Sequence, residues 1–280
     1  MALIAWDKVC IPKVAGGLNI MDIHAWNKAA ICKLLWNVCT KKDKLWVKWI
    51  HCYYGRRTTL WMSQTKQASW IVQTILKAAK YLKEVGLQEK EFILIRTFSI
   101  QRMYRKLRGE FPKCSRRRLI CNNYGAPRWV FILYLNLQER LQIIDRIAKW
   151  SQIEDLTCPL CAREPQTTEH LFFKCEMTSQ MWERLLEWQG IKKRAQGWSE
   201  EVQWAEIHAK GQSAMANMYR LCMAACVYHI WMERNLRIFQ GKSRTKEIIL
   251  RLIAQEVHNR GNQYKKLTRK LQAMKWYPRD

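Results

Sequence analysis

Three cysteines and one histidine are the residues of this chain best suited to bind a metal. Cys158 and Cys161 form a Cys-x2-Cys pair, eight residues separate Cys161 from His170, and four more separate His170 from Cys175. Thiolate sulfur and imidazole nitrogen are the donors that tetrahedral Zn²⁺ prefers. Since all four positions would be filled by protein, no place is left for a substrate, and the pattern predicts one structural Zn²⁺.

The spacing of His170 and Cys175 also predicts a break in the backbone. Residues five positions apart are about 140° apart around a helix, so an unbroken helix could not point both side chains at one metal. We therefore expect a helical turn over 168–173, a break near Cys175, and a restarted helix capped by Thr178 or Ser179. A redox role for the Cys-x2-Cys pair is the alternative, and the downstream histidine and cysteine favour metal binding.

The net charge indicates a polyanionic partner. The chain has 49 Lys+Arg against 23 Asp+Glu, a formal charge of +26, whereas a small domain carries a charge of about 2 to 8 in magnitude. Such a charge repels itself in a compact state unless anions neutralise it, and phosphate is the commonest such anion in a cell. The composition thus predicts nucleic-acid binding, with a merely soluble basic surface as the alternative.

Two segments concentrate this charge. Residues 96–118 contain nine Lys and Arg against Glu110 alone, and a basic amphipathic segment lies near the C-terminus, within 242–279. The candidate nucleic-acid-binding residues are Arg102, Arg105, Lys106, Arg108, Lys113, Arg116, Arg117, Arg118, Lys265, Lys266, Arg269 and Lys270. The C-terminal segment could lie on nucleic acid, on a partner, or on the rest of the protein.

Apolar periodicity predicts an all-α fold around the small Cys3His zinc knuckle. Apolar residues recur at helical spacing along most of the chain. Periodicity cannot assign the continuous apolar run at 129–135 to a strand or a helix, but Leu141, Ile144 and Ile147 continue it at helical spacing and favour buried helices on both sides of a short break. Helices are expected over 31–38, 45–53, 69–84, 89–108, 127–137, 214–239 and 245–274, with a polar linker over 190–211. Ser69 is a possible N-cap and Gly86 a possible stop for the third of these helices.

Cysteine usage and hydropathy predict an intracellular protein without a membrane partner. The eleven cysteines are odd in number and scattered among apolar residues, which favours a reducing compartment over a disulfide scaffold. No apolar run approaches the roughly 20 residues that a membrane span needs.

The sequence lacks a catalytic pattern. Polymerases and nucleases that use two metals need clustered carboxylates, and the six aspartates of this chain are widely separated. No Gly-rich phosphate-binding loop and no nucleophile elbow are found. We therefore expect that the chain is not an enzyme.

Short segments along most of the chain carry a resemblance to a known family. Residues 6–13 (WDKVCIPK), 16–20 (GGLNI) and 26–29 (WNKA) resemble the segment after the polymerase domain in plant non-LTR (LINE-type) retrotransposon reverse transcriptases. The zinc-binding domain of those proteins is similar to this chain at 107–109 (LRG), 121–123 (CNN), 127–129 (PRW), 145–146 (DR), 158–161 (CPLC) and 170–175 (HLFFKC).

The resemblance implies a division of the chain and a role for each part. Residues 1–86 correspond to the helical post-polymerase segment, 87–190 to the zinc-binding domain with Cys158, Cys161, His170 and Cys175 as ligands, and 191–280 to a linker with C-terminal basic helices. The polymerase domain with its aspartates would lie upstream, so this chain alone would not synthesise DNA. RNA or DNA is the implied partner, with a polymerase chain in trans as a further possibility, in the nucleus rather than the cytoplasm. A protein-interaction module retained from a retroelement is the alternative function.

Overall fold

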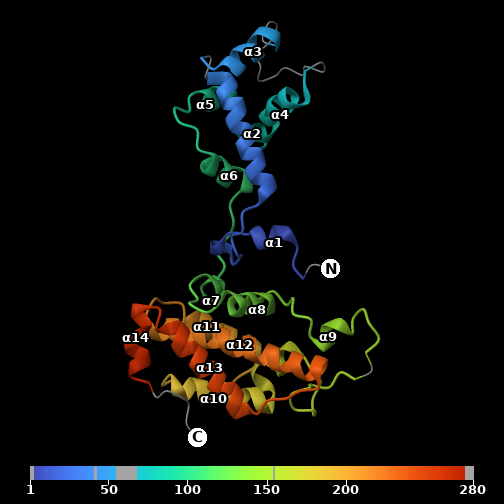
Figure 1. Cartoon of the computed structure of the whole chain (residues 1–280), viewed down its shortest axis with the longest axis vertical. Helices are drawn as coiled ribbons and strands as arrows, with labels where there is room; N and C mark the ends of the chain where they lie inside the picture. The colour runs from blue at the N-terminus through green and yellow to red at the C-terminus, as the bar shows by residue number, and fades with distance from the viewer. Residues whose placement is uncertain (1–2, 41–42, 55–67, 154, 275–280) are drawn as a thin grey trace. The chain divides into compact units, whose positions relative to one another are not determined.

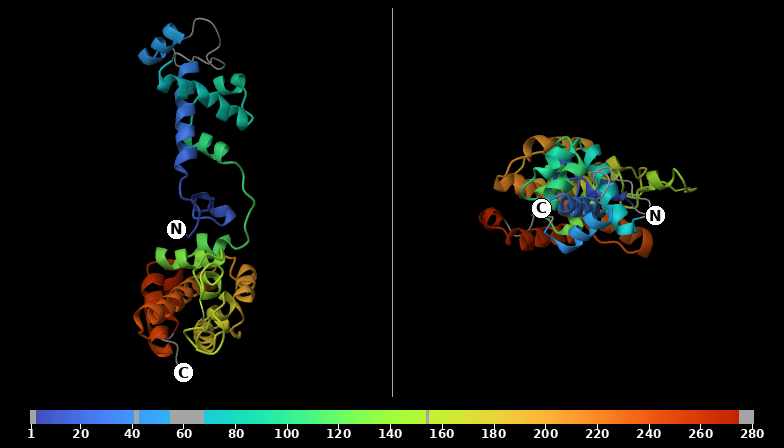
Figure 2. Two further views of the ribbon diagram at one scale, coloured as in Figure 1. Left: turned by 90° about the vertical axis from the view of Figure 1, so that its right-hand side faces the viewer. Right: turned by 90° about the horizontal axis from the view of Figure 1, so that it is seen from above.

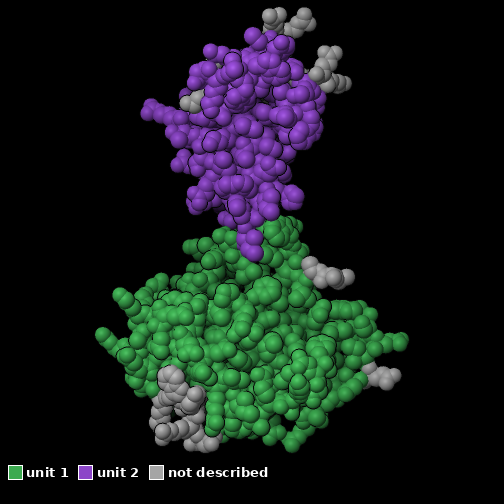
Figure 3. Space-filling model, viewed as in Figure 1, with its two compact units in different colours: residues 1–19, 113–280 green, residues 20–112 purple. Residues whose placement is uncertain are grey.

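The computed structural model describes residues 3–40, 43–54, 68–153 and 155–274. Within these ranges every regular element is helical, and strand pairing is limited to an isolated antiparallel bridge between Thr157 and Pro165. The all-α prediction is confirmed. Figure 3 colours two compact units, a larger one of residues 1–19 and 113–280 and a smaller one of residues 20–112.

The smaller unit is built around one long helix. Its helices are α2 (Ile23–Thr40), α3 (Leu45–Tyr54), α4 (Trp70–Glu84), α5 (Glu89–Ile93) and α6 (Ile100–Arg108). Helix α2 packs along both α4 and α6 (Figures 1 and 2). It buries Cys32 and Leu35 in one core with residues of α4 such as Ile75 and Leu82. The helices predicted over 31–38, 45–53 and 69–84 are confirmed.

The single helix predicted over 89–108 is wrong, because residues 94–99 separate α5 from α6. Phe92 and Phe98 are both buried, with ring centroids 6.0 Å apart. Six positions along a helix would turn them about 240° apart, so one helix could not place both in the same core. The second helix, α6, begins after its N-cap residue Ser99, whose Oγ accepts a hydrogen bond from the backbone N–H of Arg102 at 3.3 Å.

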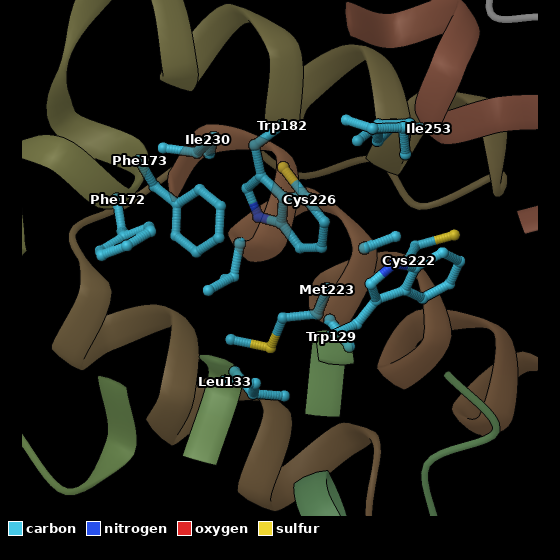
Figure 4. Close-up of a cluster of buried hydrophobic side chains, with 14 of the residues drawn as sticks. Trp129, Leu133, Phe172, Phe173, Trp182, Cys222, Met223, Cys226, Ile230 and Ile253 are labelled. Carbon is cyan, nitrogen blue, oxygen red and sulfur yellow. The ribbon is translucent and has the colours of Figure 1, made fainter. Parts of the chain in front are cut away.

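The larger unit is organised around α12, and its core residues come from segments that are far apart in the sequence (Figure 4). Helix α12 packs against α8, α10, α13 and α14. The elements of this unit are α1 (Trp6–Cys10), the turn η1 (Lys13–Ala15), α7 (Arg117–Cys121), α8 (Pro127–Leu137), α9 (Ile144–Ile147), η2 (His170–Lys174), α10 (Glu176–Trp188), α11 (Trp198–His208), α12 (Ala214–Gln240), α13 (Lys246–Gly261) and α14 (Lys265–Gln272). None of the described helices is both long and apolar enough to span a bilayer.

The N-terminal residues join the larger unit through contacts with the segment that begins at 113. The backbone N–H of Cys114 donates to the Val14 carbonyl at 3.0 Å, and the Cys121 thiol contacts the Lys13 carbonyl at 3.1 Å. Gly16 has φ +83°, and a Cβ built there would lie 3.2 Å from Cys114 Sγ. The turn at Gly16 thus needs a glycine for both its conformation and its close packing.

Two further predictions near the C-terminus are corrected. The predicted linker over 190–211 contains α11, which forms because Trp198, Val202 and Ala205 share one buried face. The helix predicted over 245–274 is broken after Gly261, where a Cβ would lie 2.5 Å from Leu271 Cδ1. The chain therefore folds back, and the apolar face of α14 lies on the protein itself.

Candidate metal centre

The four predicted metal ligands come together at one point of the larger unit. The candidate ligand atoms of Cys158, Cys161, His170 and Cys175 all lie within 4.8 Å of one another. Ligands about 2.0–2.3 Å from a tetrahedral ion stand about 3.3–3.8 Å from each other, so the group closes on one ion with shifts of about 1 Å or less. Cys158, His170 and Cys175 are buried, and Cys161 is half-buried. The donor set, the burial and the spacing all fit one structural Zn²⁺.

The first two ligands lie on a tight turn. The backbone N–H of Ala162 donates to the Cys158 carbonyl at 2.8 Å, and the Cys158 N–H donates to the Glu164 carbonyl at 2.8 Å. Ala162 has φ +54°, in the left-handed region. These bonds curl the backbone around the two sulfurs and present both to the same side.

The last two ligands are brought together by a kink in η2. Phe172 has φ −100° and ψ 96°, and Phe173 has φ 85° and ψ −9°, both outside helical values. The kink lets the Cys175 N–H donate to the His170 carbonyl at 2.7 Å. The predicted break is confirmed, although it lies two residues before Cys175.

Helix α10 then restarts at Glu176 with Cys175 in the N-cap position, so the predicted cap at Thr178 or Ser179 is wrong. Thr178 instead supports the kink from the first turn of α10. Its buried hydroxyl accepts from the Phe173 N–H at 3.3 Å and donates to the Leu171 carbonyl at 3.0 Å, with the Cys175 carbonyl at 3.3 Å.

Aromatic packing holds Phe173, the residue with positive φ, in place. The Phe173 ring is 1% exposed and stacks on Trp182 of α10, with ring centroids 4.9 Å apart (Figure 4). Trp198 of α11 lies on a second side at 6.1 Å. A bulky residue with positive φ costs of order 1–3 kcal/mol, which this buried packing offsets.

His170 is oriented from both ring nitrogens. Nε2 lies 3.3 Å from Cys161 Sγ, on the metal side, and Nδ1 lies 3.1 Å from Glu164 Oε2, an ion-pair distance without good hydrogen-bond alignment. A carboxylate behind a metal-binding histidine fixes the ring and increases its basicity.

The buried thiols of Cys158 and Cys175 share a hydrogen bond. A hydrogen bond from Cys175 lowers the pKa of Cys158 to about 5, against the effect of burial, and the same bond raises the pKa of Cys175. One proton is therefore held between the two sulfurs, and a metal that needs both as thiolates must displace it.

Cys32 and Cys39, which lie outside the metal centre, form no disulfide within the part of the chain that the structure describes. Burial raises the pKa of Cys32 to about 12 and, with a smaller effect of Glu89, that of Cys39 to about 11. Buried thiols with raised pKa values are poor nucleophiles, so these residues serve packing.

The predicted basic residues are divided between the two units. Arg102, Arg105, Lys106 and Arg108 lie on α6 of the smaller unit, whereas Lys113 and the three arginines Arg116, Arg117 and Arg118 lie at α7 of the larger unit. Arg116 pairs with Glu206 at 3.1 Å, and Arg117 Nη1 donates to the Cys114 carbonyl at 3.2 Å. The others of this set are exposed or half-buried.

Within the larger unit, a pair of tyrosines joins the chain just after α7 to the start of the basic helix α14. Tyr124, just after α7, stacks on Tyr264, just before α14, with ring centroids 4.2 Å apart. Arg260 Nε donates to the Tyr124 carbonyl at 3.0 Å and places its guanidinium 5.6 Å from the Tyr264 ring. Lys265 and Lys266 of α14 thereby lie on the same side of the unit as the segment after α7. Sequence reasoning missed both tyrosines, since nothing local marks residues so far apart as partners.

Comparison with known families agrees with the metal centre. Residues 98–182 match the family described as zinc-binding in reverse transcriptase, and this range contains all four candidate ligands. The resemblance to reverse-transcriptase zinc-binding domains is thus confirmed for this part of the chain, and with it the zinc cofactor.

A curated relative adds a short match. A protein of Arabidopsis thaliana described as a putative ribonuclease H protein is 41% identical over 44 residues, 16% of this chain and 7% of the relative. The chain therefore spans a small fraction of that protein. No solved structure matches the chain.

Proposed function

We propose that the chain is the zinc-stabilised, nucleic-acid-binding region that follows the polymerase domain of a LINE-type reverse transcriptase, and that it has no catalytic role of its own. The match to the zinc-binding family supports the retroelement origin. Nuclear RNA or DNA is the proposed partner, and a polymerase chain in trans would supply the chemistry.

The Tyr124–Tyr264 stack, which joins the chain after the basic residues at α7 to the basic helix α14, carries this proposal. Of the eight candidate cations of the larger unit, all but Arg116 lack an ion pair with an acid in the part of the chain that the structure describes: Lys113, Arg117, Arg118, Lys265, Lys266, Arg269 and Lys270. Uncompensated cations around one region attract a phosphate backbone, because binding releases the counterions condensed on it.

Salt dependence tests the proposal. Duplex affinity should fall with a log–log slope of about −0.9 for each phosphate neutralised. The variant K265E/K266E should bind more weakly and reduce the magnitude of the slope by about 2. Filter binding on single-stranded RNA, single-stranded DNA and duplex probes would measure both quantities.

A variant of equal charge provides the control. Lys192 and Lys210 are exposed and lie outside the candidate segments, so K192E/K210E makes the same change in net charge. It should retain most of the affinity. A flat salt series for the unmodified chain, or equal losses in the two double variants, would contradict binding through α14.

A further inference from the structure

An arginine from a distant helix holds the turn between the first two metal ligands. Arg237 Nη1, on α12, donates to the backbone carbonyls of Pro159 at 3.1 Å and Leu160 at 3.0 Å. These are the two residues between Cys158 and Cys161. One guanidinium nitrogen thus restrains the backbone that aims both sulfurs.

A buried carboxylate holds this arginine. Arg237 Nε donates to Glu233 Oε1 at 2.9 Å, and Glu233 is 1% exposed. Arg244 completes the cluster: its Nε donates to Glu233 Oε2 at 2.9 Å and its backbone N–H to Oε1 at 2.8 Å. A carboxylate bonded on both oxygens has little freedom, so it fixes the direction of the Arg237 side chain.

The same helix reaches the second half of the metal centre. Arg237 Nη2 lies 3.5 Å from the sulfur of Met177, two residues after Cys175. One turn earlier, the buried Arg234 donates from Nη2 to Gln166 Oε1 at 3.2 Å, behind the Cys158 turn. Both ligand segments are therefore tied to α12.

The charges are complementary. Three thiolates around one Zn²⁺ carry a net charge of −1, since the imidazole ligand is neutral. Arg234 is close enough to Cys158 for their charges to attract, and Arg237 reaches the same turn through the Pro159 and Leu160 carbonyls. In a partly dry environment such an attraction is weakly screened.

We propose that Arg237, held by Glu233, is a positioning residue of the metal centre, so that zinc affinity depends on a helix beyond the matched range 98–182. The role requires a guanidinium. Its planar fork of N–H donors can bond to two carbonyls and a carboxylate at once, whereas a lysine ammonium cannot. The inference rests on the metal centre alone and is independent of nucleic-acid binding.

Zinc affinity of the full chain, measured by competition with a chromogenic chelator, tests the proposal. R237M should weaken Zn²⁺ binding about 10- to 100-fold, as loss of an outer partner of a metal ligand does, and R237K should recover little of it. R251M, at an exposed arginine of α13, should bind like the unmodified chain. The absorption of Co²⁺ bound in place of zinc should also change in R237M, because it reports thiolate geometry.

Two comparisons separate positioning from general stability. C222A truncates a buried residue of α12 that lies 15 positions before Arg237, about 22 Å along the helix, and should lower the melting temperature with little loss of zinc affinity. If R237M does not fold, E233Q, which keeps the side-chain shape, takes its place and should also weaken zinc binding. Zinc affinity within twofold of the unmodified chain in a folded variant, or a loss in C222A as large as that in R237M, would overturn the proposal.

Discussion

The Thr178 hydroxyl offers a quantitative test of the kink that brings His170 and Cys175 together. The substitution T178V keeps the shape of the side chain but leaves the buried Phe173 N–H without its acceptor and the Leu171 carbonyl without its donor. A buried group left unpaired costs about 1–3 kcal/mol, so the two together should lower the free energy of unfolding of the larger unit by about 2–6 kcal/mol. That is a large share of the total for a domain.

Zinc release during denaturant unfolding is the assay, because it reports the unit that holds the metal centre. The midpoint of release should shift to lower denaturant in T178V at an unchanged slope. T178S keeps the hydroxyl and should lose only about 1 kcal/mol for the missing methyl group. S179A, at a half-buried neighbour whose hydroxyl bonds to the Glu176 carbonyl, should stay within about 0.5 kcal/mol of the unmodified chain. If T178V were no less stable than T178S, the hydroxyl would not hold the kink.

Three further predictions concern the metal and its surroundings. Removal of zinc by a chelator should reduce the amide-exchange protection of α10 while that of α2 and α4 is unchanged, since metal-binding free energy contributes to folding in the larger unit alone; equal loss in both units would contradict this. A162G should raise the free energy of unfolding by up to about 1 kcal/mol, and the zinc-release midpoint with it, because glycine adopts positive φ without strain. A lower midpoint would argue against strain at Ala162. Hydrogen bonds from Arg244 and Arg237 outweigh desolvation and lower the pKa of Glu233. The stability that Glu233 contributes is therefore present above its unfolded pKa of about 4.3 and is lost as the pH falls through its lowered pKa in the folded state. The difference in melting temperature between the unmodified chain and E233Q should shrink in that acid range.

The metal ligands were predictable because their chemistry is local. The spacing of Cys158, Cys161, His170 and Cys175 indicated a zinc site, and helix geometry required a break between the last two. The all-α fold followed from periodicity in the same way. Such predictions need only residues that lie close together in the sequence, and the four metal ligands all fall within residues 158–175.

The features that the sequence did not reveal depend on distant partners. Arg237 contacts Pro159, 78 positions away, and Tyr124 stacks on Tyr264 from the other end of the unit. The break at Gly261 follows from the close approach of Leu271. In each case a contact made after folding decides the local structure, and a single sequence gives no sign of it.

The discontinuous larger unit constrains the order in which the chain can fold during synthesis. Residues 13 and 14 bond to partners at 121 and 114, which emerge after the intervening 20–112 (112 − 20 + 1 = 93 residues). At about 5–20 residues per second, that interval lasts about 5–20 s. During synthesis, residues 1–19 therefore stay exposed until residues 113–121 emerge, whereas the smaller unit can complete its core before then.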